Sequence, residues 1–161
     1  MRIGIVSDTH NNLRNVTRIV GLFEAAGVDR VVHTGDITQA KTLEPFDALA
    51  APFHGVYGNN DLERESLEAT STRLGMQLLD PPLRLVWAGR RILVVHDPRD
   101  LTPEQLKTCD VALHGHDHRR HLALHCGALV MNPGECAGHV PGLNAVGVLE
   151  LVTLETELLE F

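Results

Sequence analysis

The sequence predicts an α/β protein built on two β-sheets, and three features of the chain lead to this expectation. Its first half alternates short apolar runs with segments of helical spacing, and its second half is richer in strands than in helices. Its length of 161 residues is near the common size of one domain, which buries roughly two thirds of its extended surface. No linker composition or internal repeat divides it, so we expect a single domain over residues 1–161.

Three buried strands and two helices are predicted in the first half. Residues 3–6 form an apolar run of strand length, and apolar residues then recur at helical spacing until Gly27 ends the helix. Residues 30–33 form the next strand, residues 42–49 a short helix and residues 53–57 a third strand. This β-α-β-α-β order implies right-handed crossovers and a parallel sheet.

The second half predicts a second sheet packed on the first. Gly89 and Arg90 lie between two strand-like runs, which indicates a hairpin, and Thr102-Pro103 is typical of the start of a short helix. The expected strands of this half are residues 83–87, 92–95, 111–113, 121–125, 129–131 and 145–154.

Composition and charge narrow the function classes. The chain is 43% hydrophobic and 22% charged, which is ordinary for a folded globular protein. Its formal net charge is −7, so a broad electrostatic contact with nucleic acid is not expected and a small ligand is favoured.

Cysteine usage and the N-terminus favour a cytoplasmic protein. Cys109, Cys126 and Cys136 are odd in number and form no C-x-x-C pair, which argues against both a disulfide framework and a thiolate zinc site. The first apolar run is too short for a signal peptide, and no segment approaches the roughly 18 apolar residues of a membrane span.

Metal-competent side chains follow five successive predicted strands. In parallel α/β sheets the loops at the carboxyl ends of the strands converge on a ligand, so these side chains are expected to meet. Glycines at positions 35, 58 and 115 allow the sharp turns that bring them inward. The candidate metal ligands are Asp8, His10, Asp36, Asn59, His96, His116 and His118.

The chemistry of these side chains indicates a catalytic metal rather than a structural one. Carboxylate, amide oxygen and imidazole without thiolate suit Mn²⁺, Fe, Co²⁺, Ni²⁺ or a catalytic Zn²⁺. In an extended segment His116 and His118 point to one side, as do Asp8 and His10, so each pair can face a metal cluster.

Five motifs in order carry a family resemblance. They are D-x-H at Asp8 and His10, G-D ending at Asp36, G-N-x-D at positions 58–61, the lone His96, and G-H-x-H at positions 115–118. This series resembles the calcineurin-like metallophosphoesterases. The short length and the N-P-G-E-C run at positions 132–136 look like the small bacterial and archaeal phosphodiesterase subgroup.

The resemblance implies a four-layer α/β/β/α sandwich of two mixed sheets, with a dinuclear metal site at the carboxyl ends of the strands. It also implies two divalent ions, Mn²⁺ foremost, with Ni²⁺, Fe²⁺, Co²⁺ and Zn²⁺ left open. One ion is expected at Asp8, His10, Asp36 and His118. The other is expected at Asp36, Asn59, His96 and His116, with Asp36 as the bridge.

The expected activity is hydrolysis of a small or nucleotide-like phosphate ester. Paired metal ions supply a bridging hydroxide as nucleophile, and the chain accordingly shows no G-x-S-x-G elbow, Walker loop or cysteine nucleophile motif. Asp36, Asn60 and His96 are the expected catalytic residues.

Two positions depart from the wider family pattern. Active phosphatases of the family often carry His where Asn60 stands, and an amide has no titratable proton for the leaving group. We therefore expect modest activity, biased towards good leaving groups. Asp97 stands where a glycine commonly follows the strand-end histidine.

Simpler interpretations apply to several polar residues. Asn59 is also compatible with an ordinary turn. His33 and His114 are interpreted mainly as structural, whereas His121, His54, His125 and His139 receive no role. Asp61 and Asp117 are candidate partners of ligating imidazoles, and the turn at positions 132–134 is expected to pack under the site.

Two other function classes remain open at this point. A eukaryotic sorting-complex subunit uses this fold chiefly for protein contacts, so a metal-binding interaction scaffold with weak or no catalysis is the main alternative. A nuclease shares only the metal site, and the acidic balance argues against it. A homodimer is compatible with the apolar strands of the second half, and no membrane partner is expected.

Overall fold

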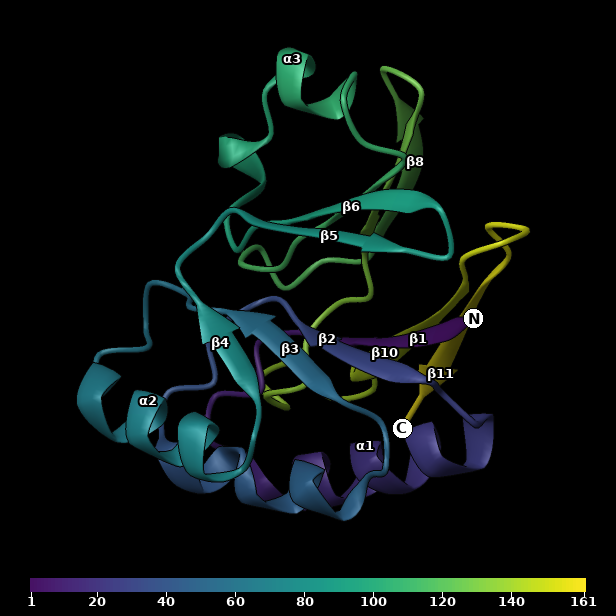
Figure 1. Cartoon of the computed structure of the whole chain (residues 1–161). Coiled ribbons are helices and arrows are strands. Elements are labelled where there is room, and N and C mark those ends of the chain that lie inside the picture. Colours follow the sequence, from purple (N-terminus) through teal and green to yellow (C-terminus); the bar gives the residue numbers. More distant parts are fainter.

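Two mixed sheets form the centre of the computed structural model, which describes residues 1–161 (Figure 1). The strands of the first sheet are β1 (Arg2–Val6), β2 (Arg30–His33), β3 (Phe53–Val56), β4 (Gln77–Leu79), β10 (Ala145–Glu150) and β11 (Thr156–Glu160). Their order is β11-β10-β1-β2-β3-β4. Strands β1 to β4 pair in parallel, and β10 adds antiparallel to β1.

The second sheet has five strands. These are β5 (Leu83–Trp87), β6 (Arg90–Val94), β7 (Val111–Leu113), β8 (His121–His125) and β9 (Ala128–Asn132). In the order β5-β6-β7-β9-β8, strands β6, β7 and β9 are parallel, and a hairpin strand closes each edge.

Helices cover the outer faces of both sheets, so the expected four-layer α/β/β/α arrangement is confirmed (Figure 1). Helices α1 (Leu13–Ala26) and α2 (Arg64–Arg73) cover the first sheet. The short helix α3 (Pro103–Leu106) and a 3-10 turn at Pro98–Asp100 lie beyond the second. None of these helices combines the length and apolar character needed to cross a membrane.

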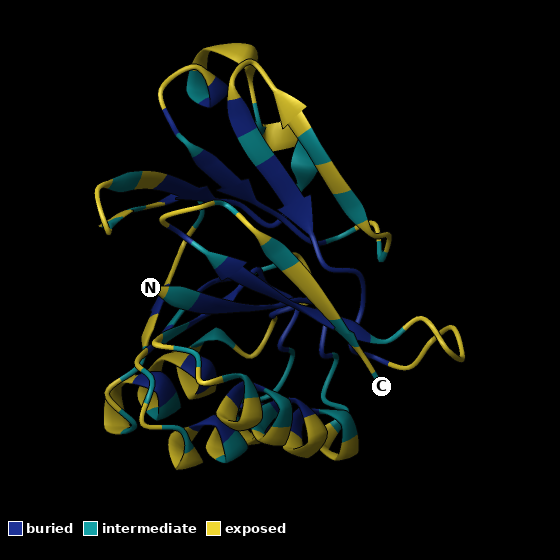
Figure 2. Cartoon of the chain, turned by 90° about the vertical axis from the view of Figure 1, so that its right-hand side faces the viewer, coloured by how far each residue is buried: buried dark blue, intermediate teal, exposed yellow.

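Apolar side chains fill the space between the sheets. In Figure 2 the strands that border this layer are coloured largely as buried. Ile5 and Val32 of the first sheet belong to the same fully buried cluster as Val94 and Leu113 of the second. A further cluster joins the first sheet to α1 through Val16, Ile19 and Phe23. The packed interface fixes the two sheets relative to one another, and it therefore also fixes the loops at their ends.

Local signals explain the elements that the sequence predicted. Helix α1 starts at Asn12, whose side chain accepts a hydrogen bond from the Asn15 backbone, and it ends at Gly27 in the left-handed conformation. Helix α3 has the capping box of Thr102 and Gln105.

Two expectations about secondary structure were wrong, and further elements were not predicted. Residues 42–49 form no regular helix, because 3-10 turns at Ala40–Thr42 and Glu44–Ala48 fill this stretch. The expected strand 145–154 ends at Glu150, where a turn begins and leads into β11. Helix α2 and strand β4 were not predicted, because α2 buries only Leu67 and Ser71 and shows almost no apolar periodicity.

A substitution at Gly4 of β1 tests how tightly α1 packs on the first sheet. A Cβ atom at this position would lie 2.8 Å from the fully buried ring of Phe23, so Gly4→Ala is expected to lower the free energy of unfolding by about 1–3 kcal/mol. Gly21→Ala is the control, because nothing lies within 4 Å of that position on α1, and it is expected to stabilise by about 0.5–1 kcal/mol. Urea unfolding measures both; equal stability of Gly4→Ala and the natural protein would contradict the packing argument.

Candidate metal centre

Five loops at the carboxyl ends of β1, β2, β3, β6 and β7 meet at one edge of the sandwich. Backbone hydrogen bonds join neighbouring loops within each sheet: Asp8 N donates to Gly35 O at 3.1 Å, and Gly115 N donates to His96 O at 3.0 Å. Between the sheets, His96 Nδ1 lies 2.9 Å from Thr34 O. All seven predicted ligands lie on these loops. The convergence expected from strand order is therefore present.

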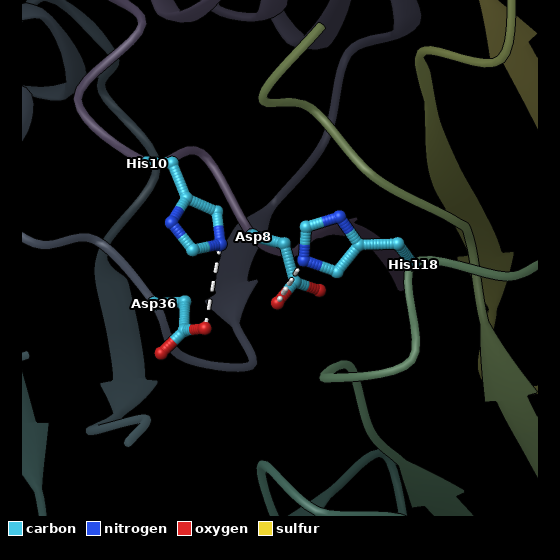
Figure 3. A group of neighbouring side chains, drawn as sticks. All are labelled: Asp8, His10, Asp36 and His118. Carbon is cyan, nitrogen blue, oxygen red and sulfur yellow. Dashed lines mark ion pairs between the residues drawn. The ribbon is translucent and has the colours of Figure 1, made fainter. Parts of the chain in front are cut away.

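The first group of predicted ligands consists of Asp8, His10, Asp36 and His118. One ligand atom of each lies within 4.8 Å of those of the other three, and Figure 3 shows the four side chains directed towards one another. His10 Nε2 lies 3.4 Å from Asp36 Oδ2, and His118 Nε2 lies 3.5 Å from Asp8 Oδ1. This is the set expected for the first ion.

The second group consists of Asp36, Asn59, His96 and His116. Asn59 Oδ1 lies 2.9 Å from both His96 Nε2 and His116 Nδ1, and His96 Nε2 lies 3.5 Å from Asp36 Oδ1. Asp36 thus turns one carboxylate oxygen to each group. Its placement between them is the one expected of a bridging ligand.

The hydrogen bonds of His96 define which ring nitrogen is free. Its Nδ1 lies 2.9 Å from the carbonyl oxygen of Thr34, which only accepts, so Nδ1 carries the proton. In the neutral ring, Nε2 then presents a lone pair to the oxygens of Asn59 and Asp36, which are also acceptors. Acceptors that face one another in this way call for a cation between them.

Glu135 fixes the tautomer of His118 as the Thr34 carbonyl fixes that of His96, and the sequence did not predict this role. Its carboxylate is fully buried, and Oε2 lies 3.1 Å from His118 Nδ1, so this nitrogen donates and Nε2 is left for a ligand. The other oxygen accepts from the backbone of Val140 at 2.7 Å, and His139 stacks on His118 with ring centres 5.3 Å apart. The signal was the acidic residue of the N-P-G-E-C run, which comes directly after the turn expected at positions 132–134.

The backbone of the centre is unusually strained. Five of the seven predicted ligands have a positive φ, a conformation that non-glycine residues rarely adopt and that concentrates at functional sites. They are Asp8 (51°), His10 (40°), Asp36 (59°), His116 (75°) and His118 (56°). The expectation of extended segments was therefore wrong, although His116 and His118 still face the two groups to which the resemblance assigned them.

Glycines allow the loops to approach closely. Gly35 has a φ of 106°, and a Cβ there would lie 2.6 Å from His96 Nδ1. At Gly58 and Gly115 a Cβ would collide with the carboxylates of Asp36 and Asp8. Of these three glycines, only Gly35 adopts a positive φ. At Gly58 and Gly115 glycine is required because a larger residue would not fit.

Asp61 and Asn60 hold the Asp36 loop. The buried Asp61 carboxylate accepts from the backbone N–H groups of Asp36, Thr38 and Gly58 at 3.0, 2.6 and 2.6 Å, so it pairs with backbone and not with an imidazole. The Asn60 side chain donates to Asp36 Oδ2 at 2.8 Å. Burial raises the pKa of Asp36, but the adjacent His10 and Asn60 outweigh it and keep the pKa well below its usual range.

The remaining polar residues occupy supporting positions. Asp97 Oδ2 lies 3.6 Å from His116 Nε2, so the residue in the place of the family's glycine faces a predicted ligand. Asp117 accepts from the Asn132 side chain and contacts no predicted ligand's imidazole. His33 is fully buried and accepts from the backbone N–H of Gly35 at 3.1 Å, in agreement with a structural role. Burial lowers the pKa of His33 to about 3.

A cavity of about 520 Å³ opens beside the second group. Asn59, His96 and His116 form one wall, and Arg64 and Arg99 lie on the others. Only one of its eleven lining residues is hydrophobic, so the cavity favours a small polar group.

The donor set fits two divalent cations. His10 Nε2 is buried without a hydrogen-bond partner, and the free nitrogens of His96 and His118 face acceptor oxygens. Oxygen and imidazole donors without thiolate suit catalytic first-row metals.

Comparisons with known proteins agree with this geometry. The family model of the calcineurin-like phosphoesterase superfamily domain matches residues 1–156. A phosphodiesterase of Methanocaldococcus jannaschii is 31% identical over 154 residues, which cover 93% of each chain. The solved structure of an archaeal phosphodiesterase superposes with a TM-score of 0.92 at 29% identity and full coverage of both chains.

A more distant structure shares only the fold. Zinc-bound Vps29 from Entamoeba histolytica has a TM-score of 0.69 at 18% identity, with coverage of 100% of this chain and 98% of that one. The family match and the archaeal relative confirm the resemblance that the motifs indicated. This chain belongs to the calcineurin-like phosphoesterase superfamily.

Proposed function

We propose that the protein is a metal-dependent phosphodiesterase that hydrolyses small polar or nucleotide-like phosphate esters. The observation that carries the proposal is the position of Asp36, which directs one carboxylate oxygen to each of two groups of metal-competent side chains. The similar archaeal phosphodiesterase supports the reaction class.

Two divalent ions, with Mn²⁺ as the first choice, fit the two groups and when bound would activate water and neutralise charge on the phosphate. Asp8, His10, Asp36 and His118 would hold one ion, and Asp36, Asn59, His96 and His116 the other. No side-chain nucleophile is then required.

The chain's own residues orient the donors and the substrate. Thr34 and Glu135 fix the tautomers of His96 and His118, so that each directs a lone pair into the centre. Asn60 lies beside Asp36 at the open side, where its amide can hydrogen-bond a phosphate oxygen but offers no titratable proton. The polar cavity beside the second group provides space for the ester's alcohol group.

Asp36→Asn tests the shared carboxylate. The amide has one neutral oxygen, whereas the carboxylate has two oxygens that share a negative charge. We therefore expect kcat/KM for bis-p-nitrophenyl phosphate with Mn²⁺ to fall roughly a hundredfold to a thousandfold. Asp47→Asn, the same exchange at an exposed position, is the control and is expected to retain full activity. No turnover by the natural protein with any divalent metal, or full activity of Asp36→Asn, would reject the proposal.

Glu135→Gln tests the partner of His118. The amide cannot satisfy both the Val140 N–H and the His118 Nδ1–H, so metal affinity is expected to fall about 10–100-fold, as for other partners of ligating histidines. Competition with a fluorescent chelator measures it, and the exposed Glu104→Gln is the control. Unchanged affinity would assign Glu135 to the fold alone.

Asn60→His tests the missing proton donor. A titratable imidazole at position 60 can protonate the leaving group, so we expect the hydrolysis rate of diphenyl phosphate to rise at least about tenfold. A gain of this size is at the low end for general acid catalysis. The rate for bis-p-nitrophenyl phosphate is expected to change far less, because nitrophenolate leaves without protonation. Equal changes in both rates would show that position 60 does not serve the leaving group.

A further inference from the structure

A second histidine cluster lies on the outer face of the second sheet, on the side of α3. We call it the histidine pocket: a cavity of about 350 Å³ lined by His114, His121, His125, Asp117 and the apolar residues Leu101, Leu106 and Val130. His121 and His125 come from the edge strand β8, and His114 follows β7. None of the three is among the seven predicted ligands of the metal centre.

Sheet register explains why these imidazoles share a face. Ala123 of β8 pairs with Val130 of β9, which belongs to the outer apolar cluster, so His121 and His125 also point outwards. Their rings stack 5.5 Å apart on either side of the small Ala123. His114 is two residues beyond Ala112 of the same outer cluster and therefore faces the same pocket.

The tautomer of His114 leaves a nitrogen free for a ligand. This ring is only 3% exposed, and its Nδ1 donates to the carbonyl oxygen of Gly115 at 3.2 Å. In the neutral ring Nε2 then carries a lone pair. A backbone carbonyl that fixes one nitrogen and frees the other is the arrangement found behind metal-bound histidines.

The ring spacings of the histidine pocket are slightly longer than those of the metal centre, so the rings need to close to share one ion. Imidazoles that share a tetrahedral ion at about 2 Å have ring centres about 5 Å apart. His10 and His118 lie 5.2 Å apart, and His96 and His116 lie 5.1 Å apart. In the histidine pocket the separations are 5.8 Å from His114 to His121 and 5.5 Å from His121 to His125.

We propose that the histidine pocket is a separate site for a first-row transition metal ion, held by His114, His121 and His125. Three imidazoles beside an apolar wall suit Zn²⁺, Cu²⁺ or Ni²⁺, and Asp117 at the rim favours a cation over an anion. The stacked rings of His121 and His125 need to turn about Cβ–Cγ, a torsion that is broad in histidine. The site does not depend on the proposed phosphodiesterase activity.

Zinc stoichiometry tests the proposal, with Zn²⁺ alone as the probe. The metal-free natural protein and His121→Ala/His125→Ala are titrated by equilibrium dialysis, and the variant is expected to bind one equivalent less. Leu122→Ala/Leu124→Ala is the matched control, because these two exposed side chains lie on the opposite face of the same strand. This control is expected to bind as much Zn²⁺ as the natural protein.

Further measurements assign the bound ion to the histidine pocket. Long-range ¹H–¹⁵N spectra are expected to show the ring nitrogens of His121 and His125 shifting with the additional equivalent, and Cys126→Ser is expected to retain it. Hydrolysis of bis-p-nitrophenyl phosphate is expected to be unchanged in His121→Ala/His125→Ala, and thermal unfolding checks that β8 remains folded. Equal stoichiometry in both proteins, unshifted ring nitrogens or loss of the ion in Cys126→Ser would overturn the assignment.

Discussion

The buried carboxylate of Asp61 is the constraint on which the rest of the centre depends. It accepts three backbone N–H groups from the loops after β2 and β3, and these bonds hold Asp36 at a φ of 59°. In this conformation Asp36 can face both groups of donors. A buried charge is costly unless it is hydrogen-bonded, and here the bonding is supplied by backbone that would otherwise be unsatisfied.

The centre is assembled at the expense of local stability. Each residue with an unfavourable backbone conformation costs on the order of 1–3 kcal/mol, and five such residues lie within the predicted ligand set. The apolar layer between the sheets and the contact of α1 with the first sheet offset this cost. The loops can be strained because the strands that carry them are fixed by packing outside the centre.

Strand order made the centre predictable, whereas its supporting contacts were not. Asp36 and His96 each follow a short apolar run, so the pattern alone places them at carboxyl ends of strands that converge. Glu135 lies in a loop and reaches His118 only through the folding of β9 back onto the site, which local sequence does not encode. Helix α2 escaped prediction for a related reason, because few of its side chains face the core.

Architecture alone does not decide between catalysis and binding, because one fold can carry many functions. The donor set is more informative. His96 is buried, and leaving its Nε2 lone pair against the acceptor oxygen of Asn59 costs about 1–3 kcal/mol. A scaffold that needed only its surface would be stabilised by apolar residues at these positions. The presence of His96 and Asn59 together, with Thr34 and Glu135 fixing the tautomers, therefore favours a metal-binding centre.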